Sequence, residues 1–186
     1  MPRLLTSLFA VGVALTLAGC SSPEPAPTTS ADPVPSVAAS LIPTAPPANV
    51  VDVEPVNFAG EFGDYTFRVG DGPTWCTINV DRKNVICEQS EADALYSPIP
   101  VPASCEFSYG YQVQLFAETP TDGTKTADFV CSGGAYADPT NAATLNSGER
   151  VTLDGISCFV DGTAARCENA AHKYIVLGPK VWATGN

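Results

Sequence analysis

The chain has 186 residues, 45% of them hydrophobic, and a formal net charge of −11 at pH 7 from 20 acidic and nine basic residues. Residues 57–186 keep this excess, with eight basic residues against 16 acidic ones. Phosphate binding needs clustered cations, and the basic residues of this chain are scattered. We therefore do not expect it to bind nucleic acid or bare anionic lipid.

The first residues have the plan of an export signal, with a positive charge at Arg3, an apolar run from Leu4 to Leu17 and small residues up to Cys20. The run is too short for a comfortable membrane span. Its end, Leu17-Ala18-Gly19-Cys20, resembles the lipobox of bacterial lipoproteins, which are cleaved before the cysteine. We therefore expect residues 1–19 to be a lipoprotein signal peptide. The alternative is an ordinary secretory signal with an incidental cysteine.

Cys20 is the expected mature N-terminus and the site of lipid attachment through its thiol. Acyl chains such as palmitate bury about 0.8 kcal/mol per CH2 group, so two or three chains hold a protein at a membrane without a spanning helix. The expected location is therefore the extracytoplasmic face of the cell membrane, and the membrane itself is a partner through the lipid on Cys20.

Residues 20–56 are expected to form a disordered tether. The stretch from Ser21 to Val56 holds nine of the 17 prolines and neither lysine nor arginine. Such a composition buries too little apolar surface to offset the entropy of ordering. At about 3.1 Å per residue the tether would reach roughly 110 Å. Thr28, Thr29 and Ser30 are the densest candidates for O-glycosylation, although a bare spacer explains them as well.

Six cysteines remain once Cys20 is assigned to lipid, and an even number outside the cytoplasm predicts disulfides, with 15 possible pairings. Two pairs bracket β-prone arms around a polar turn and are typical of cross-linked hairpins. The third pair then follows by elimination. The expected disulfides are Cys76–Cys87, Cys158–Cys167 and Cys105–Cys131. A zinc site is disfavoured because no pair is spaced as CxxC and the lone histidine lies beyond the last cysteine.

Residues 57–186 are expected to form one disulfide-rich β domain. Short apolar or alternating runs recur with Gly, Asp and Pro turn signals between them, and no window of twelve residues shows a helical stripe. This pattern predicts an all-β fold, a small antiparallel sandwich or barrel stapled by three disulfides. The expected strands are 65–69, 75–80, 84–88, 111–116, 126–131, 150–153, 156–160, 165–168 and 173–177.

Two further features concern the organisation of this domain. Residues 97–102 alternate with proline, which lacks the ladder donor, so they are expected to form an extended crossing between two halves. The two short disulfide hairpins are alike, and each second cysteine is followed by a glutamate, Glu88 or Glu168. Either two similar units flank a central hairpin, or the similarity between the two hairpins arises by chance.

The cysteine order and surrounding residues resemble a family of uncharacterised actinobacterial secreted proteins and lipoproteins with three disulfides. The resemblance covers about residues 65–177 and supports the pairing of neighbouring cysteines. The glycines usual around the family's histidine are absent at Ala171-His172-Lys173, and the family implies no activity. The matching positions are Phe67, Gly72, Cys76, Pro102–Cys105, Gly110, Val113, Leu115, Phe129–Cys131, Gly133, Leu145–Gly148, Gly155–Cys158, Cys167–Asn169, His172 and Tyr174.

Catalytic motifs are sparse. His172 could act as a general base beside Asp154, Asp161 or Glu168, with a serine as nucleophile. No GxSxG motif, calcium loop or phosphate-binding loop is present, and no catalytic residue, metal ligand or cofactor is assigned. A loop histidine bonded to the backbone is the alternative interpretation.

The sequence therefore favours a non-enzymatic binding or accessory module of the cell envelope with a protein or glycan partner. A hydrolase using His172 and a protease-inhibitor-like module presenting the loop 119–125 are the alternatives. An aromatic cluster around the central crossing suits either a sugar platform or core packing; it comprises Tyr96, Phe107, Tyr109 and Tyr111.

Overall fold

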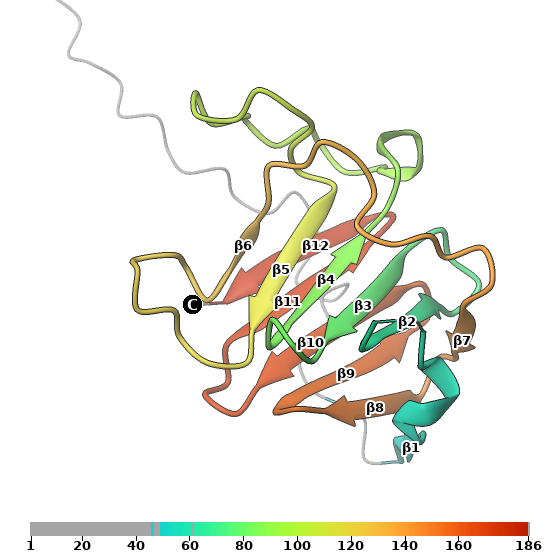
Figure 1. Ribbon diagram of the computed structural model, residues 1–186. Helices are drawn as coiled ribbons and strands as arrows, with labels where there is room; N and C mark the ends of the chain where they lie inside the picture. The colour runs from blue at the N-terminus through green and yellow to red at the C-terminus, as the bar shows by residue number, and fades with distance from the viewer. Residues whose placement is uncertain (1–45, 47–48, 61, 186) are drawn as a thin grey trace, which may run out of the picture. The chain divides into compact units, whose positions relative to one another are not determined.

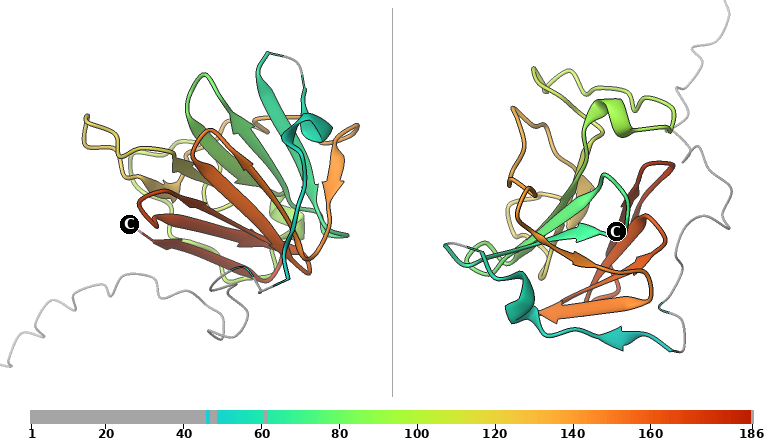
Figure 2. Two further views of the ribbon diagram at one scale, coloured as in Figure 1. Left: turned by 90° about the horizontal axis from the view of Figure 1, so that it is seen from below. Right: turned by 90° about the vertical axis from the view of Figure 1, so that its right-hand side faces the viewer.

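The structure, a computed structural model, describes residues 46, 49–60 and 62–185. The expected signal peptide, the lipid site at Cys20 and the tether up to residue 45 lie outside the described residues. Across the described ranges the chain forms twelve strands in two six-stranded sheets that pack face to face (Figures 1 and 2). These ranges include no helix that is long and apolar enough to cross a membrane.

The strands are distributed between sheet A and sheet B. In spatial order, sheet A consists of β1 (Val51–Asp52), β8 (Glu149–Leu153), β9 (Ile156–Asp161), β10 (Ala164–Asn169), β11 (Tyr174–Gly178) and β12 (Val181–Gly185). Sheet B consists of β6 (Ala127–Phe129), β5 (Gln112–Phe116), β4 (Asn84–Glu88), β3 (Trp75–Asn79), β2 (Asp64–Val69) and β7 (Ala143–Leu145). Two short 3-10 helices, η2 (Pro55–Phe58) and η3 (Glu91–Asp93), lie in the connections.

The core lies between the two sheets because alternate side chains of each strand point inward. Sheet B contributes Phe67, Ile78 and Leu115, and sheet A contributes Ile175 and Leu177, all with no exposed surface. Four half-cystines of the two short disulfide hairpins are buried in the same cluster. The disulfides therefore add covalent links inside an apolar core.

The two sheets are built by two topological repeats within the described residues. In each repeat four consecutive strands form an antiparallel meander, β2–β3–β4–β5 in sheet B and β8–β9–β10–β11 in sheet A, and a fifth strand follows at the edge. Cys76 pairs with Cys87 across β3 and β4, and Cys158 pairs with Cys167 across β9 and β10. Cys87 and Cys167 thus occupy equivalent positions, as do Glu88 and Glu168 after them.

The first strand of each repeat belongs to the other sheet. β1 precedes β2 in the chain but pairs with β8, and β7 precedes β8 but pairs with β2. Both pairings are parallel, whereas the meanders are antiparallel. Each repeat therefore depends on the other for an edge strand, so neither sheet is complete within a single repeat (Figure 1).

The all-β sandwich stapled by three disulfides is confirmed, and the nine expected strands are present with ends shifted by at most two residues. Three expectations need correction. The ordered domain begins before residue 57, because Val51 and Asp52 pair with β8. Residues 97–102 connect β4 to β5 within one sheet, so they do not cross between halves. The central hairpin, β5–β6, belongs to the first repeat and does not separate two units.

Candidate functional site

His172, the histidine considered as a base, lies in the turn between β10 and β11. Its Nδ1 is 2.6 Å from Glu168 Oε1, and its side chain is 86% exposed. Asn169 shapes the turn by accepting hydrogen bonds from the backbone N–H groups of Ala171 and Lys173. In the described part of the chain, neither a hydroxyl group nor Asp154 hydrogen-bonds to the ring, so the geometry forms a His–Glu pair without an aligned nucleophile.

Glu168 is held from both sides, since Arg166 Nη2 also donates to its Oε2 at 2.9 Å. Partial burial acts to raise the pKa of Glu168, but the hydrogen bonds from His172 and Arg166 outweigh it and lower the pKa below its ordinary value. The Arg166 guanidinium in turn lies 3.7 Å from the centre of the Tyr174 ring. Glu168 is therefore an ionised, doubly paired carboxylate, which suits a structural role.

A groove of about 300 Å³ lies beside this cluster on the outer face of sheet A. Its floor is a cross-strand row in which Phe159 lies between Arg150 and Arg166. Arg150 is also paired with Asp52, at 2.7 Å from Nε to Oδ1. Thr152 and Ser157 place a hydroxyl pair 3.0 Å apart on the neighbouring row, and Pro46 lines the groove from the chain that precedes β1.

The equivalent face of sheet B is covered by the chain itself. Residues 130–142, here called the strap, connect β6 at one edge of the sheet to β7 at the other (Figure 1). Glu88 anchors the strap by accepting hydrogen bonds from the backbone N–H groups of Tyr136 at 2.9 Å and Ala137 at 3.0 Å. Trp75 Nε1 and Gln112 Nε2 donate to the same carboxylate. Glu88 is 1% exposed, so these four donors compensate a buried charge.

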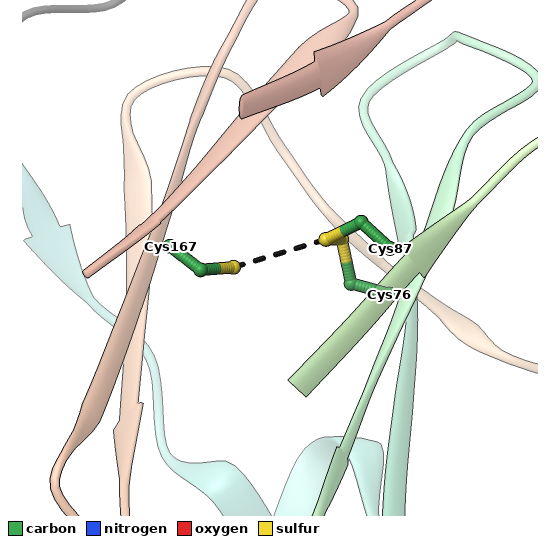
Figure 3. Close-up of side chains that lie close together, drawn as sticks. All are labelled: Cys76, Cys87 and Cys167. Carbon is green, nitrogen blue, oxygen red and sulfur yellow. Dashed lines mark hydrogen bonds between the residues drawn. A yellow bond between two sulfur atoms is a disulfide. The ribbon is translucent and has the colours of Figure 1, made fainter. Parts of the chain in front are cut away.

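All three predicted disulfides are present in the described residues: Cys76–Cys87, Cys105–Cys131 and Cys158–Cys167. Cys76, Cys87 and Cys167 bring their sulfur atoms within 4.8 Å of one another between the sheets (Figure 3). A metal would require thiolates, and each of these sulfur atoms is already bonded in a disulfide. The cluster is therefore a stack of two disulfides.

The aromatic cluster predicted around residues 96–111 divides into core and surface residues. The Tyr96 hydroxyl accepts from Gln89 Nε2 and donates to the Gly110 carbonyl, and burial raises the pKa of Tyr96 to about 12. Tyr109 packs on Phe129 at 5.8 Å between ring centres. Tyr111 lines a small cavity of about 240 Å³, while Phe107 is 64% exposed. These aromatic residues therefore form no shared platform.

A larger cavity, of about 660 Å³, lies between the strap, η2 and the start of β2. Phe62 stands at its rim, 88% exposed, with a positive φ of 59° that bulky residues rarely adopt. Tyr136 of the strap faces the same space, and the Arg82 guanidinium lies 5.5 Å from its ring centre. The polar lining comes from carboxylates, amides and a hydroxyl, namely Asn57, Asp64, Thr66, Asp138 and Asn141.

Two of these carboxylates are oriented by neighbours. Asp64 accepts a hydrogen bond from Asn79 Nδ2. Asp138 accepts from the hydroxyl of Thr140 at 2.6 Å and from its backbone N–H at 2.9 Å, and these bonds lower the pKa of Asp138. Sequence reasoning missed this site, because Phe62, Tyr136 and Asn141 lie in loops and the strap is far from Phe62 in the chain. The glycines at positions 60 and 63 are the one local signal of a special turn.

Comparison of the chain with protein-family models, curated proteins and solved structures finds no match.

Proposed function

We propose that the domain is a non-enzymatic binding module of the cell envelope, anchored through lipid on Cys20, and that the cavity at Phe62 and Tyr136 binds a neutral glycan. The export signal, the lipobox resemblance and the disulfides support the location, because structural disulfides persist in oxidising compartments. We also propose kinship with the actinobacterial lipoprotein family that the cysteine order resembles.

The observation that carries the glycan proposal is that the exposed Phe62 ring and the half-buried Tyr136 ring line one cavity with two oriented carboxylates and two amides. Volumes of about 300–1,000 Å³ are typical of small-ligand sites. An aromatic face covers the apolar face of a sugar ring, while Asp64, Asp138 and Asn141 offer hydrogen-bond partners for its hydroxyl groups. Because the cavity holds carboxylates and the domain is acidic, an uncharged sugar is favoured over an acidic one.

Phe62 supports this proposal independently of the cavity's size. A non-glycine residue in the left-handed region costs about 1 kcal/mol or more, and exposing a phenylalanine gains nothing for folding. Such a residue is retained more readily where its ring contacts a ligand. Gly63, also at positive φ, allows the tight turn that presents the ring.

Binding is tested by titrating the mature protein with neutral gluco-, manno-, galacto- and arabino-oligosaccharides in a calorimeter. We expect at least one series to bind, and Phe62→Ala or Tyr136→Ala to weaken that binding about tenfold, or about 1.4 kcal/mol. Phe107→Ala is the matched control, because it removes another exposed phenylalanine outside the cavity. Absence of binding to every series, or equal losses in all three variants, would rule out the glycan site.

The hydrolase alternative rests on the Glu168–His172 pair, and the same experiment addresses it. Bound oligosaccharide should remain intact, and His172→Ala should bind it as the unmodified protein does. Cleavage of the oligosaccharide that disappears in His172→Ala would instead establish an enzyme. For the protease-inhibitor alternative, an inhibition panel with substitutions in residues 119–125 provides the corresponding test.

A further inference from the structure

The three disulfides of the domain differ in their access to solvent. The four half-cystines of the two short hairpins have no exposed surface, whereas Cys131 is exposed and Cys105 is half-buried. A disulfide is reduced when a thiolate attacks one of its sulfur atoms, so access to that sulfur decides which disulfide reacts. Of the three, Cys105–Cys131 is therefore the disulfide that a reductant reaches in the folded domain.

This disulfide also differs in the segments that it joins. The other two each link neighbouring strands that are already paired by backbone hydrogen bonds. Cys105 lies in the connection between β4 and β5, and Cys131 lies in the strap, so their bond joins two segments outside the twelve strands. The hydrogen bonds within the sheets do not depend on it. Its reduction can therefore change the strap while the sandwich stays folded.

The disulfide fixes the beginning of the strap. Beside it, Ser108 and Ser132 exchange backbone hydrogen bonds of 3.1 and 2.9 Å, which hold the strap against the β4–β5 connection. Every residue of that connection from Val101 to Ser108 is exposed except Cys105. This stretch therefore has little packing of its own to keep Ser108 against Ser132 once the disulfide is cleaved.

The same strap carries residues of the proposed glycan cavity. Farther along it, the Gly134 carbonyl accepts from Gln112 Nε2 at 2.7 Å, and the N–H of Tyr136 donates to Glu88 at 2.9 Å. Tyr136 lines the cavity. The disulfide thus anchors one end of a short row of hydrogen bonds that positions the Tyr136 ring.

We propose that Cys105–Cys131 is a thiol–disulfide exchange site for a dithiol, such as the CxxC pair of a thioredoxin-like oxidoreductase, and that its reduction loosens the strap and weakens binding in the cavity. The effect on binding rests on the proposed function, whereas the exchange and the loosening do not. The oxidised state, described by the structure, is the binding state.

The exchange proceeds in two steps. One thiolate of the dithiol bonds to the sulfur of Cys131, the more exposed partner, and releases Cys105 as a thiolate that takes up a proton. The second thiol of the dithiol then displaces Cys131 and closes the disulfide of the reductant. The domain gains two electrons and two protons, which the dithiol loses. The Phe107 carbonyl lies 3.4 Å from Cys105 Sγ, where it can accept a hydrogen bond from the new thiol.

The first test reduces the mature protein under native conditions. Dithiothreitol, a dithiol, is added, and the new thiols are alkylated and located by peptide mapping. We expect Cys105 and Cys131 to be labelled at least about tenfold faster than the four buried half-cystines. The variant Cys105→Ser, Cys131→Ser is the control and should take no label in the same time. Labelling of all six cysteines at one rate, or of none until the domain unfolds, would overturn the proposal.

The second test follows the strap by hydrogen exchange. Exchange at the N–H groups of Tyr136 and Ala137 should become about tenfold faster in the reduced protein and in the Cys105→Ser, Cys131→Ser variant. The N–H groups of β9 and β10 serve as the internal control and should keep their rates. Unchanged exchange at Tyr136 and Ala137 would show that the disulfide does not hold the strap.

The third test is calorimetry with the neutral oligosaccharide that binds best. The reduced and alkylated protein should bind about tenfold more weakly than the oxidised protein, and the same treatment should not change the weak binding of the double-serine variant. Equal binding before and after reduction would overturn the regulation and leave the glycan site intact. Absence of binding in both states would instead refute the glycan site, and the labelling and exchange rates would still decide whether the disulfide is an exchange site that holds the strap.

Discussion

The Sγ atoms of Cys87 and Cys167 lie 3.8 Å apart, although each is bonded to a different partner and the residues are 80 positions apart in the chain. Cys87 belongs to β4 of sheet B and Cys167 to β10 of sheet A. Both residues have no exposed surface and occupy equivalent positions in the two repeats. The Cys76–Cys87 disulfide of sheet B therefore meets Cys167 of sheet A at the boundary between the repeats (Figure 3).

This proximity predicts a new covalent link when the native partners are removed. In the double variant Cys76→Ser, Cys158→Ser, the thiols of Cys87 and Cys167 face each other, and incubation with oxidised glutathione, which is reduced to two thiols, should join them in an inter-sheet disulfide. Alkylation without reduction should then add no label to these residues, and peptide mapping should recover the Cys87–Cys167 pair.

The matched variant Cys87→Ser, Cys167→Ser leaves Cys76 and Cys158. Cys158 is not part of the group whose sulfur atoms lie within 4.8 Å, so this variant should keep two alkylatable thiols. Two free thiols in the first variant as well would contradict the stacking of Cys87 on Cys167.

Glu88 should be far less tolerant of amide substitution than Glu168. Each oxygen of Glu88 accepts two N–H donors, so Glu88→Gln turns an NH2 group toward two of them in a buried site. Hydrogen bonds to a charged group contribute about 1.5–3 kcal/mol each, and the expected loss in the free energy of unfolding is about 3 kcal/mol or more. Urea unfolding measures it. Glu168→Gln is the control and should cost about 1 kcal/mol; equal losses would show that the strap is not anchored by Glu88.

Acid should weaken the contribution of Glu168. Since folding lowers the pKa of Glu168, the carboxylate stabilises the fold above the ordinary pKa of about 4.5, and this stabilisation is lost as the pH falls through the lower, folded-state pKa. The difference in unfolding free energy between the unmodified protein and Glu168→Gln should therefore be present at about pH 5 and shrink as the pH falls below that. A difference that persists unchanged to about pH 2 would argue against the pairing with His172 and Arg166.

The contribution of Tyr96 to stability should be lost at high pH, whereas that of Glu168 is lost at low pH. Burial raises the pKa of Tyr96 to about 12, so the neutral phenol is favoured by folding, and its contribution is present below the unfolded pKa of about 10 and lost toward pH 12. Tyr96→Phe should lower the unfolding free energy at pH 8 by about 1 kcal/mol, because Gln89 and the Gly110 carbonyl lose their partner. This deficit should narrow between about pH 10 and 12. In a spectrophotometric titration of the variant, the tyrosine that ionises at the highest pH should be absent.

The sequence was sufficient for the meanders and the disulfides because both are local. Alternation of apolar residues between turn signals marks strands such as β4 and β9, and cysteines that bracket a short hairpin can reach each other across it. The similarity in sequence between Cys87-Glu88 and Cys167-Glu168 reflects the two repeats. It was too short to reveal that each repeat has six strands.

The exchanged strands could not be predicted in the same way. β1 and β7 contain two and three residues and pair in parallel with strands distant in sequence, so no local periodicity marks them. The candidate glycan cavity could not be predicted for the same reason, because Phe62 and Tyr136 line one cavity only where the strap crosses sheet B. The apolar run of β12, Val181–Gly185, was a readable signal that the interpretation missed.

NMR chemical-shift mapping with the tightest-binding neutral oligosaccharide tests most directly whether the cavity beside the strap is the binding site. We predict shifts concentrated at Phe62, Asp64, Tyr136 and Asn141, with the outer face of sheet A unchanged. Shifts concentrated at Phe159, Glu168 and His172, or none at saturating sugar, would contradict it.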